Sequence, residues 1–209
     1  MKNEQREIPD PRISSIRETL LTREDVLAPL PGPSRTKTHA AVSVILRVGD
    51  ELELLLIRRA QAKGDPWSGH MAFPGGRWSP SDPTLRDTAV RETMEETGLC
   101  LDTLGAELGR LEPLEPNTFR LPPISIFPFV FAVPPEASAR VASREVDEVH
   151  WTPVASLLAP DAIGTTAIDL GRITRDFPCF RVEGRAVWGL TYRILIGFFS
   201  IIRVQESHR

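Results

Sequence analysis

Three glutamates in one short run carry the chemistry that this sequence offers. Glu92, Glu95 and Glu96 are spaced i, i+3 and i+4, so in a helix their carboxylates crowd one face. Like charges at this spacing cost roughly 0.2–0.5 kcal/mol per pair, and acids near the end of a helix also oppose its dipole. Arg91 is the fixed cation close by. Because the run accepts this repulsion, it predicts a bound divalent cation, and oxygen ligands favour Mg²⁺ or Mn²⁺ over zinc.

A solvated acidic face is the alternative interpretation of the same run. In that case Arg91 and Glu95 form an i, i+4 ion pair at the surface. The glycine loop Phe73-Pro74-Gly75-Gly76, which lies shortly upstream, favours the metal site instead.

Loop and helix together resemble the Nudix box, whose usual pattern is G-x5-E-x7-R-E-U-x-E-E-x-G-U, with U a bulky aliphatic residue. Gly76 opens the pattern here, and its second half is filled by Arg91, Glu92, Glu95, Glu96, Gly98 and Leu99. The loop is one residue longer than the pattern, so the first glutamate falls on Pro83, with Asp82 beside it. Thr93 stands at an aliphatic position.

Upstream residues resemble the coenzyme A pyrophosphatase branch of the Nudix hydrolases. That branch carries an LLTxR-[SA]-x3-R-x3-G-x3-FPGG signature, which residues 54–60 and 65–77 follow in part. Ile57 replaces its Thr, and Gly64 stands where its second Arg would be. Residues 144–151 and 187–191 are similar to the same branch.

The resemblance implies an α/β/α sandwich in which the box helix packs on a mixed sheet. It also implies hydrolysis, at the pyrophosphate, of a nucleoside diphosphate linked to another group, with Mg²⁺ or Mn²⁺. The branch implies coenzyme A or its thioesters, cut to 3′,5′-ADP and 4′-phosphopantetheine or its acyl form. Two alternatives stay open: the same chemistry on ADP-ribose, NADH or another nucleoside diphosphate derivative, and a domain that binds a nucleotide without turnover.

Residue roles follow from the same resemblance. Glu92, Glu95 and Glu96 are expected to bind the metal, with a backbone carbonyl of Gly75 or Gly76 as a further ligand. One of the glutamates or a loop acid acts as the base, and Arg91 orients the carboxylates through bidentate hydrogen bonds.

Several residues outside the box are open to both a functional and a structural role. Arg58, Arg59, Lys63 and Arg77 bracket the long loop, where they meet a phosphate, such as the 3′-phosphate of coenzyme A, or are solvated at the surface. Glu145 and Glu148 supply an extra ligand or base, or face solvent. For His70, Trp67 and Phe73 we favour hydrogen bonding and packing over catalysis and base stacking, and we expect Trp151 and Trp188 in the core.

Composition agrees with one domain and an appendage. The chain has 209 residues, 41% of them hydrophobic, and its net charge of −3 argues against nucleic acid as a partner. Cys100 and Cys179 are too few and too far apart for a disulfide framework. The N-terminal residues lack the apolar core of a signal peptide, and the most apolar run, 194–202, is too short to cross a bilayer. We therefore expect a cytoplasmic protein without membrane contact, as a monomer or homodimer.

Periodicity predicts an α+β domain over residues 38–209, preceded by a helical extension over residues 1–37. Asp82 and Pro83 predict the N-cap and first residue of the box helix, and Gly98 its end. Residues 60–81 form a loop too long to be a passive connection. Strands are expected at 41–48 and 51–59, which form a hairpin, and at 106–111, 124–133, 145–151 and 187–202, with a short helix at 153–158.

Overall fold

The centre of the fold is a mixed seven-stranded sheet. The structure is a computed structural model that describes residues 6–24, 27, 30, 38–62, 67–116, 123–169 and 173–206. The strand order is β3-β2-β1-β6-β5, with β4 paired to β1 and β7 paired to β2. The strands are β1 (Thr38–Val48), β2 (Leu52–Arg59), β3 (Met71–Ala72), β4 (Gly75–Arg77), β5 (Ala106–Arg110), β6 (Ile124–Val133) and β7 (Val146–Pro153).

Strand β1 organises this sheet because it pairs with three partners. It runs parallel to β6 along nearly its whole length. Its C-terminal half forms the predicted hairpin with β2, in the register Leu46↔Leu54. Its N-terminal half pairs instead with β4, so that Ala41 lies opposite Gly76. The glycine loop is therefore held as a short strand beside the centre of the sheet.

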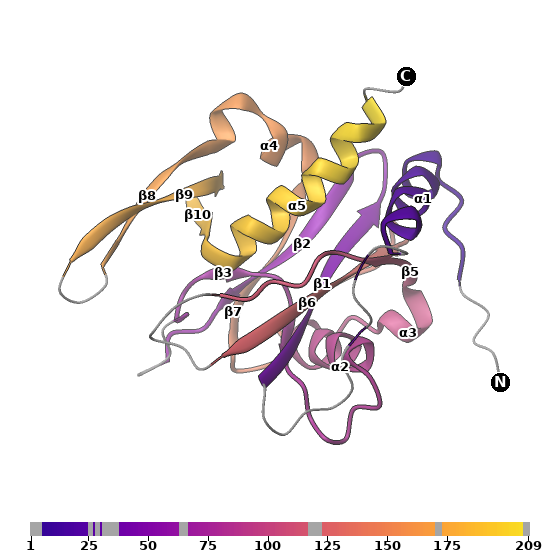
Figure 1. Cartoon of the computed structure of the whole chain (residues 1–209), viewed down its shortest axis with the longest axis horizontal. Helices are drawn as coiled ribbons and strands as arrows, with labels where there is room; N and C mark the ends of the chain where they lie inside the picture. The colour runs from indigo at the N-terminus through magenta and orange to yellow at the C-terminus, as the bar shows by residue number, and fades with distance from the viewer. Residues whose placement is uncertain are drawn as a thin grey trace.

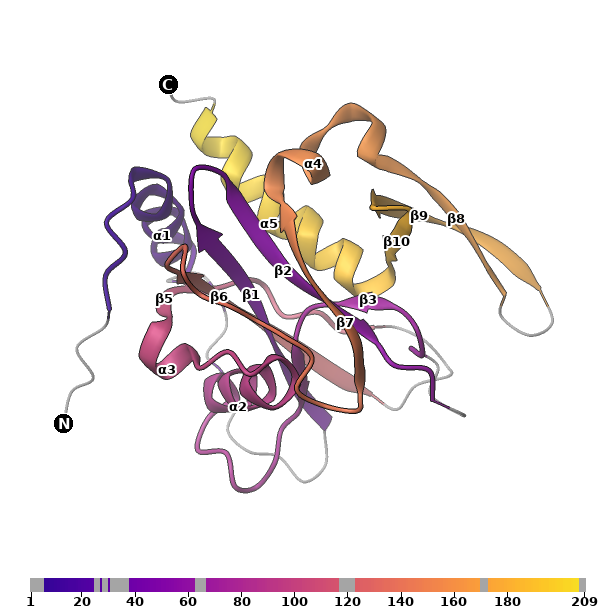
Figure 2. The ribbon, with the colours of Figure 1, turned by 180° about the vertical axis from the view of Figure 1, so that it is seen from behind.

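Helices cover both faces of the sheet, as Figures 1 and 2 show from opposite sides. Successive residues of β2 alternate between the two faces: Leu54 and Leu56 belong to one hydrophobic cluster and Leu55 to the other. The first cluster includes α1 (Pro11–Glu24) and α5 (Gly189–Glu206), and the second includes the box helix α2 (Leu85–Thr97) and the short α3 (Leu101–Leu104). The expected α/β/α sandwich is confirmed.

The predicted helix of the N-terminal extension is α1. Its apolar stripe, Ile13, Ile16 and Leu20, is buried against the first cluster. Pro29, Pro31, Gly32 and Pro33, residue types that predict the end of this helical segment, lie outside the described residues.

A second, three-stranded sheet lies beside the sandwich and was not expected from the sequence. After α4 (Val154–Leu158) and a short 3₁₀ turn (Pro160–Ala162), it is formed by β8 (Ile163–Asp169), β9 (Thr174–Val182) and β10 (Arg185–Trp188) in the order β10-β9-β8. Figure 1 shows β8 and β9 extending away from the rest of the molecule.

The strand expected at residues 187–202 is wrong beyond Trp188, because the chain continues as the helix α5. The buried residues Ile194, Leu195, Phe198 and Phe199 recur at helical spacing, whereas Arg193 before them and Ile196 and Gly197 between them are exposed. The uniformly apolar character of the nine-residue run conceals that periodicity. No helix in the described residues is long and apolar enough to cross a membrane.

Candidate active site

The box helix begins two residues later than the sequence predicted. Its N-cap is Thr84, whose side chain accepts a hydrogen bond from the amide of Asp87, while the Asp87 carboxylate accepts one from Thr84. This capping box replaces the expected cap by Asp82. The predicted end at Gly98 is confirmed: its φ is 67°, and its amide donates to the carbonyl of Met94.

Asp82 serves another purpose, because its buried carboxylate binds Arg91. The guanidinium Nε and Nη2 of Arg91 each donate to one Asp82 oxygen, both at 2.9 Å. The hydroxyl of Thr88 and the amide of Ser79 also donate to Asp82. The hydrogen bonds from Arg91 are the main reason that the pKa of Asp82 lies below its ordinary value. The loop before the helix is thereby fastened to the middle of the helix.

The three glutamates of the run occupy different environments. Glu96 is 3% exposed, and its Oε2 accepts a hydrogen bond of 2.9 Å from the amide of Gly75. Glu92 is mostly buried and lies 2.9 Å from Nη1 of Arg91. Glu95 is exposed and pairs with the same nitrogen at 3.1 Å. Arg91 therefore contacts Asp82, Glu92 and Glu95 at once, and its bidentate hydrogen bonds go to Asp82 and not to a glutamate of the run.

Burial raises the pKa of both inner carboxyl groups. For Glu96 burial is the largest cause and raises the pKa to about 7; the hydrogen bond from Gly75 opposes this effect, and repulsion from Glu92 and Glu145 adds to it. The pKa of Glu92 is also raised, again mainly by burial, although its pairing with Arg91 lowers it. Both carboxylates would gain from a nearby positive charge.

Two glycines allow the loop to approach these carboxylates. Gly75 has a φ of 152°, and a side chain there would meet the backbone of Ala41. A Cβ at Gly76 would lie 2.5 Å from the carboxyl carbon of Glu92. The loop is also attached to strand β1, because the amide of Ser43 donates to the carbonyl of Pro74 at 2.8 Å.

A cavity of about 920 Å³ opens beside the loop and the box helix. The box contributes Gly75, Gly76, Arg77, Glu92 and Glu95 to its lining. The sheet and the loops around it contribute Ala40, Val42, Arg59, Trp67, His70, Met71, Ala72, Phe73, Pro116, Ile124, Ile126 and Glu145. The C-terminal part of the chain contributes Phe177, Pro178 and the segment 188–194.

The structure brings only some of the residues proposed outside the box to this cavity. Arg59, Arg77 and Glu145 line it. Arg58 does not, because neighbouring residues of a strand point to opposite faces; it forms an ion pair of 2.6 Å with Glu148 instead. Lys63 lies outside the described residues.

The division of the aromatic residues between the core and the cavity agrees only in part with the prediction. Phe73 is buried, as packing requires, and it also lines the cavity together with Trp67 and His70. Trp151 packs against the second hydrophobic cluster beneath Arg47. Trp188 is not a core residue: it is half-buried, lines the cavity and contacts His70 with a ring-centroid distance of 4.7 Å.

The carboxylates have the chemistry that a hard divalent cation needs. Glu92 and Glu96 are buried acids with raised pKa values, and Glu145 and the glycine loop line the cavity that Glu92 also lines. No three Asp, Glu, His or Cys side chains of the described residues converge closely enough to enclose a metal ion by themselves. Glu95 in particular is turned toward Arg91.

Two features of the site differ from what the sequence pattern predicts. Asp82 is predicted as a helix cap and instead binds Arg91, although its place beside the first glutamate position of the box was a usable signal. Residues 188–191 belong to a segment whose resemblance to the coenzyme A branch was a signal. Phe177 and residues 192–194 had none, because their place at the cavity depends on how α5 crosses the sheet.

Known proteins share both the fold and the sequence pattern. Residues 37–176 match the NUDIX domain. The Nudix hydrolase NudL of Yersinia pestis is 30% identical over 162 residues, which cover 78% of each chain. The mitochondrial coenzyme A diphosphatase NUDT8 of Homo sapiens is 37% identical over 127 residues, 59% of this chain and 51% of the human protein.

Among solved structures, a MutT/nudix family protein from Enterococcus faecalis has a TM-score of 0.55 at 20% identity, covering 96% of this chain and 76% of that one, which shows the common fold. The chain spans about half of the human relative, and less of another curated relative. Because the NUDIX match extends over well more than half of the sequence and contains the whole box, the chain belongs to the Nudix hydrolase family.

Proposed function

We propose that the protein is a divalent-metal-dependent pyrophosphohydrolase that cleaves coenzyme A or its thioesters. The bond cut is the phosphoric anhydride, and the products are 3′,5′-ADP and 4′-phosphopantetheine or its acyl form. The observation that carries the proposal is the pair of buried carboxylates, Glu92 and Glu96, beside a glycine loop at the end of a large cavity.

Hydrolysis of a diphosphate requires that a highly charged anion be held while a water molecule attacks one phosphorus. Glu92, Glu95 and Glu96, with a carbonyl of Gly75 or Gly76, would hold Mg²⁺ or Mn²⁺. Such an ion, when bound, neutralises phosphate charge and lowers the pKa of water. Without it, three acids on one helix face would repel the substrate.

The chain's own residues divide the remaining tasks. Arg91, held by Asp82, keeps Glu92 and Glu95 in place. Arg59 and Arg77 line the cavity and supply positive charge to the substrate phosphates. Glu145 lies close enough to raise the pKa of both Glu92 and Glu96, so it is a candidate for the acid outside the helix that accepts a proton from water.

Two observations support coenzyme A as the substrate. The human relative named above is a coenzyme A diphosphatase, and the upstream signature resembles that branch. The cavity, of about 920 Å³, has the size of a site for a large ligand, and most of its lining residues outside the box are apolar or aromatic. A long, partly apolar substrate matches such a cavity better than a compact triphosphate does.

Mass spectrometry of reaction products is the direct test. The protein is incubated with Mg²⁺ or Mn²⁺ and, in parallel, with coenzyme A, ADP-ribose and NADH, and Glu92→Gln serves as the inactive control. We expect 3′,5′-ADP and 4′-phosphopantetheine from coenzyme A. If AMP forms from ADP-ribose or NADH while coenzyme A stays intact, the reaction type stands and the coenzyme A assignment is wrong. If none of the three compounds yields a product, enzymatic function on this panel is refuted.

We further propose a reducing compartment such as the cytoplasm. Cys179 is buried, Cys100 is partly buried, and both are free thiols.

A further inference from the structure

The far side of the cavity is built by a part of the chain that lies beyond the family match. The match ends at residue 176, and Phe177, Pro178 and residues 188–194 form this side. We call these residues the C-terminal wall. Their elements, β9, β10 and the start of α5, belong to the second sheet and to the helix opposite the box helix. The box and the C-terminal wall are therefore contributed by different layers of the molecule.

The C-terminal wall is attached firmly to the rest of the site. The buried hydroxyl of Thr191 donates to the carbonyl of Met71 in β3 at 3.1 Å. The ring of Trp188 packs between Phe177, at a centroid distance of 5.2 Å, and His70. Arg185 of β10 reaches Glu148 of β7 at 2.6 Å. These contacts join the second sheet and α5 to β3, β7 and His70 of the first sheet and its loop, so the wall is placed relative to the box.

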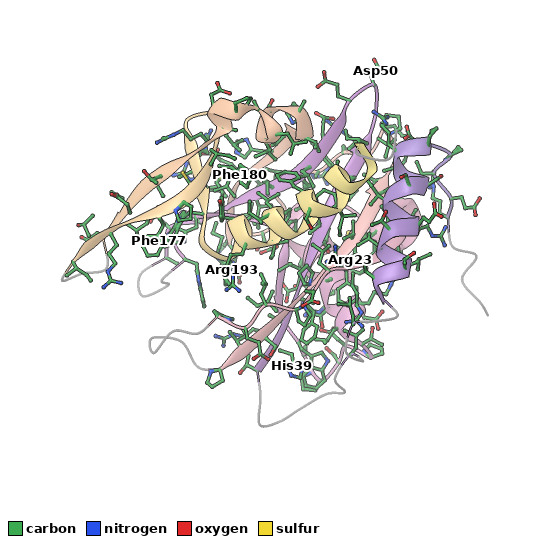
Figure 3. All side chains as sticks on the ribbon, turned by 45° about the horizontal axis from the view of Figure 1, so that its top comes forward. Arg23, His39, Asp50, Phe177, Phe180 and Arg193 are labelled. Carbon is green, nitrogen blue, oxygen red and sulfur yellow. The ribbon has the colours of Figure 1, made fainter. Side chains whose placement is uncertain are left out.

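Arg193 is the cation of this wall. It lies in the second turn of α5, lines the cavity and is exposed. Figure 3 shows it near the end of α5 that is closer to Phe177 of β9. Within the described residues, its guanidinium has no hydrogen bond or ion pair. Of the other charged residues that line the cavity, Glu92, Glu95 and Glu145 are acids, and Arg59 and Arg77 lie beside them on the sheet. Arg193 thus places a positive charge on the opposite side.

An unpaired arginine in a cavity is suited to an oxyanion on the ligand. The planar guanidinium group of arginine binds phosphate in a bidentate manner. The first turn of α5, which also lines the cavity, carries the positive end of the helix dipole. Coenzyme A, the substrate proposed above, carries one anionic group away from the scissile diphosphate, the phosphate monoester on its ribose.

We propose that Arg193 binds this ribose 3′-phosphate and thereby determines substrate specificity from outside the family domain. The inference rests on the proposed function for its ligand, but its own evidence is the position of Arg193 and the absence of a partner for it among the described residues. Arg59 and Arg77, near the box, would then act on the diphosphate common to all substrates of this class.

Binding measurements test the proposal without requiring turnover. Titration calorimetry compares 3′,5′-ADP with 5′-AMP, which differ only in the 3′-phosphate, on the full chain with Mg²⁺. We expect the wild-type protein to prefer 3′,5′-ADP and Arg193→Gln to lose about 10- to 100-fold in affinity for it, the range for a hydrogen bond to a charged group, with 5′-AMP unaffected. Arg193→Lys is expected to restore part of the preference.

The matched control is Arg175→Gln, which removes an exposed arginine of β9 that does not line the cavity. It is expected to change neither affinity. A wild-type protein that shows no preference for 3′,5′-ADP, or an Arg193→Gln variant that keeps it, overturns the proposal.

Kinetics separate this inference from the proposed function. If coenzyme A is cleaved, Arg193→Gln is expected to lower kcat/KM for coenzyme A and not for dephospho-coenzyme A, whereas Arg77→Gln lowers both. If coenzyme A is not cleaved while Arg193→Gln abolishes the preference for 3′,5′-ADP, the proposed function is refuted and the phosphate site at Arg193 stands.

Discussion

Glu96 shows how one residue joins stability to function. In the unfolded chain its carboxyl ionises near the ordinary value of 4.5, whereas in the folded protein its pKa is about 7. Between these two values the folded state keeps a proton that the unfolded state has released, so the free energy of unfolding falls as the pH rises. The difference corresponds to roughly 3 kcal/mol above neutral pH. Above neutral pH, the buried carboxylate of Glu96 therefore lowers the stability of the metal-free protein.

We expect Glu96→Gln to lose most turnover and to be at least as stable as the wild type without metal at pH 8. The neutral side chain removes the burial of a charge and the repulsion from Glu92. Urea denaturation in the presence of a chelator, at pH 5 and pH 8, measures the effect. The pH dependence between these values should be smaller in the variant. Glu95→Gln, at an exposed position, is the control and should retain it. A variant less stable than the wild type at pH 8 would contradict this prediction.

The absence of a side chain at Gly76 leaves the space that the carboxylate of Glu92 occupies. We expect Gly76→Ala to fold but to lose about 100-fold in kcat, because its Cβ would displace the carboxylate of Glu92 and misplacements of about 1 Å have such effects. Steady-state kinetics and circular dichroism make the measurement. Gly197→Ala in α5 adds a methyl group where no atom lies within 4 Å, and it should leave kcat unchanged. Equal kcat values for both variants would exclude the close packing of Glu92 on the loop.

At the scale of elements, the glycine loop and the box helix behave as one unit. The amide of Gly75 donates to Glu96, and Asp82 accepts from Arg91, so the segment before the helix is tied to the helix at two points. Thr93 ties the helix to the sheet as well, because its buried hydroxyl donates to the hydroxyl of Ser43 in β1 at 2.8 Å. Thr93 stands where the box usually has an aliphatic residue, and this hydrogen bond is the reason that a polar residue is accepted there.

We expect Asp82→Asn to destabilise the protein by roughly 1.5–3 kcal/mol, the range for hydrogen bonds to charged groups. Because the pKa of Asp82 is lowered in the folded state, its contribution is present above its ordinary value of 3.8 and is lost as the pH falls further. Thermal unfolding at pH 7 and pH 3 measures both effects, and the difference between variant and wild type should shrink at pH 3. Asp102→Asn, an exposed partner of Arg86, should change stability much less. An equal loss at both pH values would disprove the charged pairing with Arg91.

At the scale of the whole molecule, the site lies where three parts of the chain meet. The box helix packs on one face of the sheet, α5 on the other, and the second sheet beside them. If the two proposals above hold, the chemistry and the substrate selection belong to separate layers, and the C-terminal wall can change without disturbing the carboxylates.

A divalent cation should stabilise this assembly as a whole. At a concentration of about 100 times its Kd, a ligand of the folded state adds about 2.7 kcal/mol, which for a chain of this size raises Tm by roughly 5–10 °C. We expect Mn²⁺ or Mg²⁺ to have this effect on the wild type and little effect on Glu92→Gln. The exposed Glu136→Gln is the control and should respond as the wild type does. An equal rise in Glu92→Gln would place the cation elsewhere.

Those features of the protein that depend on neighbouring residues alone could be predicted from the amino-acid sequence. The box residues lie within a single helix and the loop before it, and the end of that helix at Gly98 follows from one glycine. The hairpin β1–β2 and strand β6 lie close to where alternation and apolar runs predicted them, because short apolar segments bounded by turn residues are typical of strands in a buried sheet.

Which residues reach the site depends instead on how distant elements pack. Arg58 and Arg59 are adjacent in sequence, and the pleat of β2 alone sends one to Glu148 and the other to the cavity. The run at 194–202 is apolar enough for a strand, and its contacts with the sheet make it a helix. Arg193 and Glu92 are about a hundred residues apart, and no periodicity relates them. Local spacing encodes a helix face or a strand face, whereas a cavity is defined by contacts between distant elements, which only the packed molecule specifies.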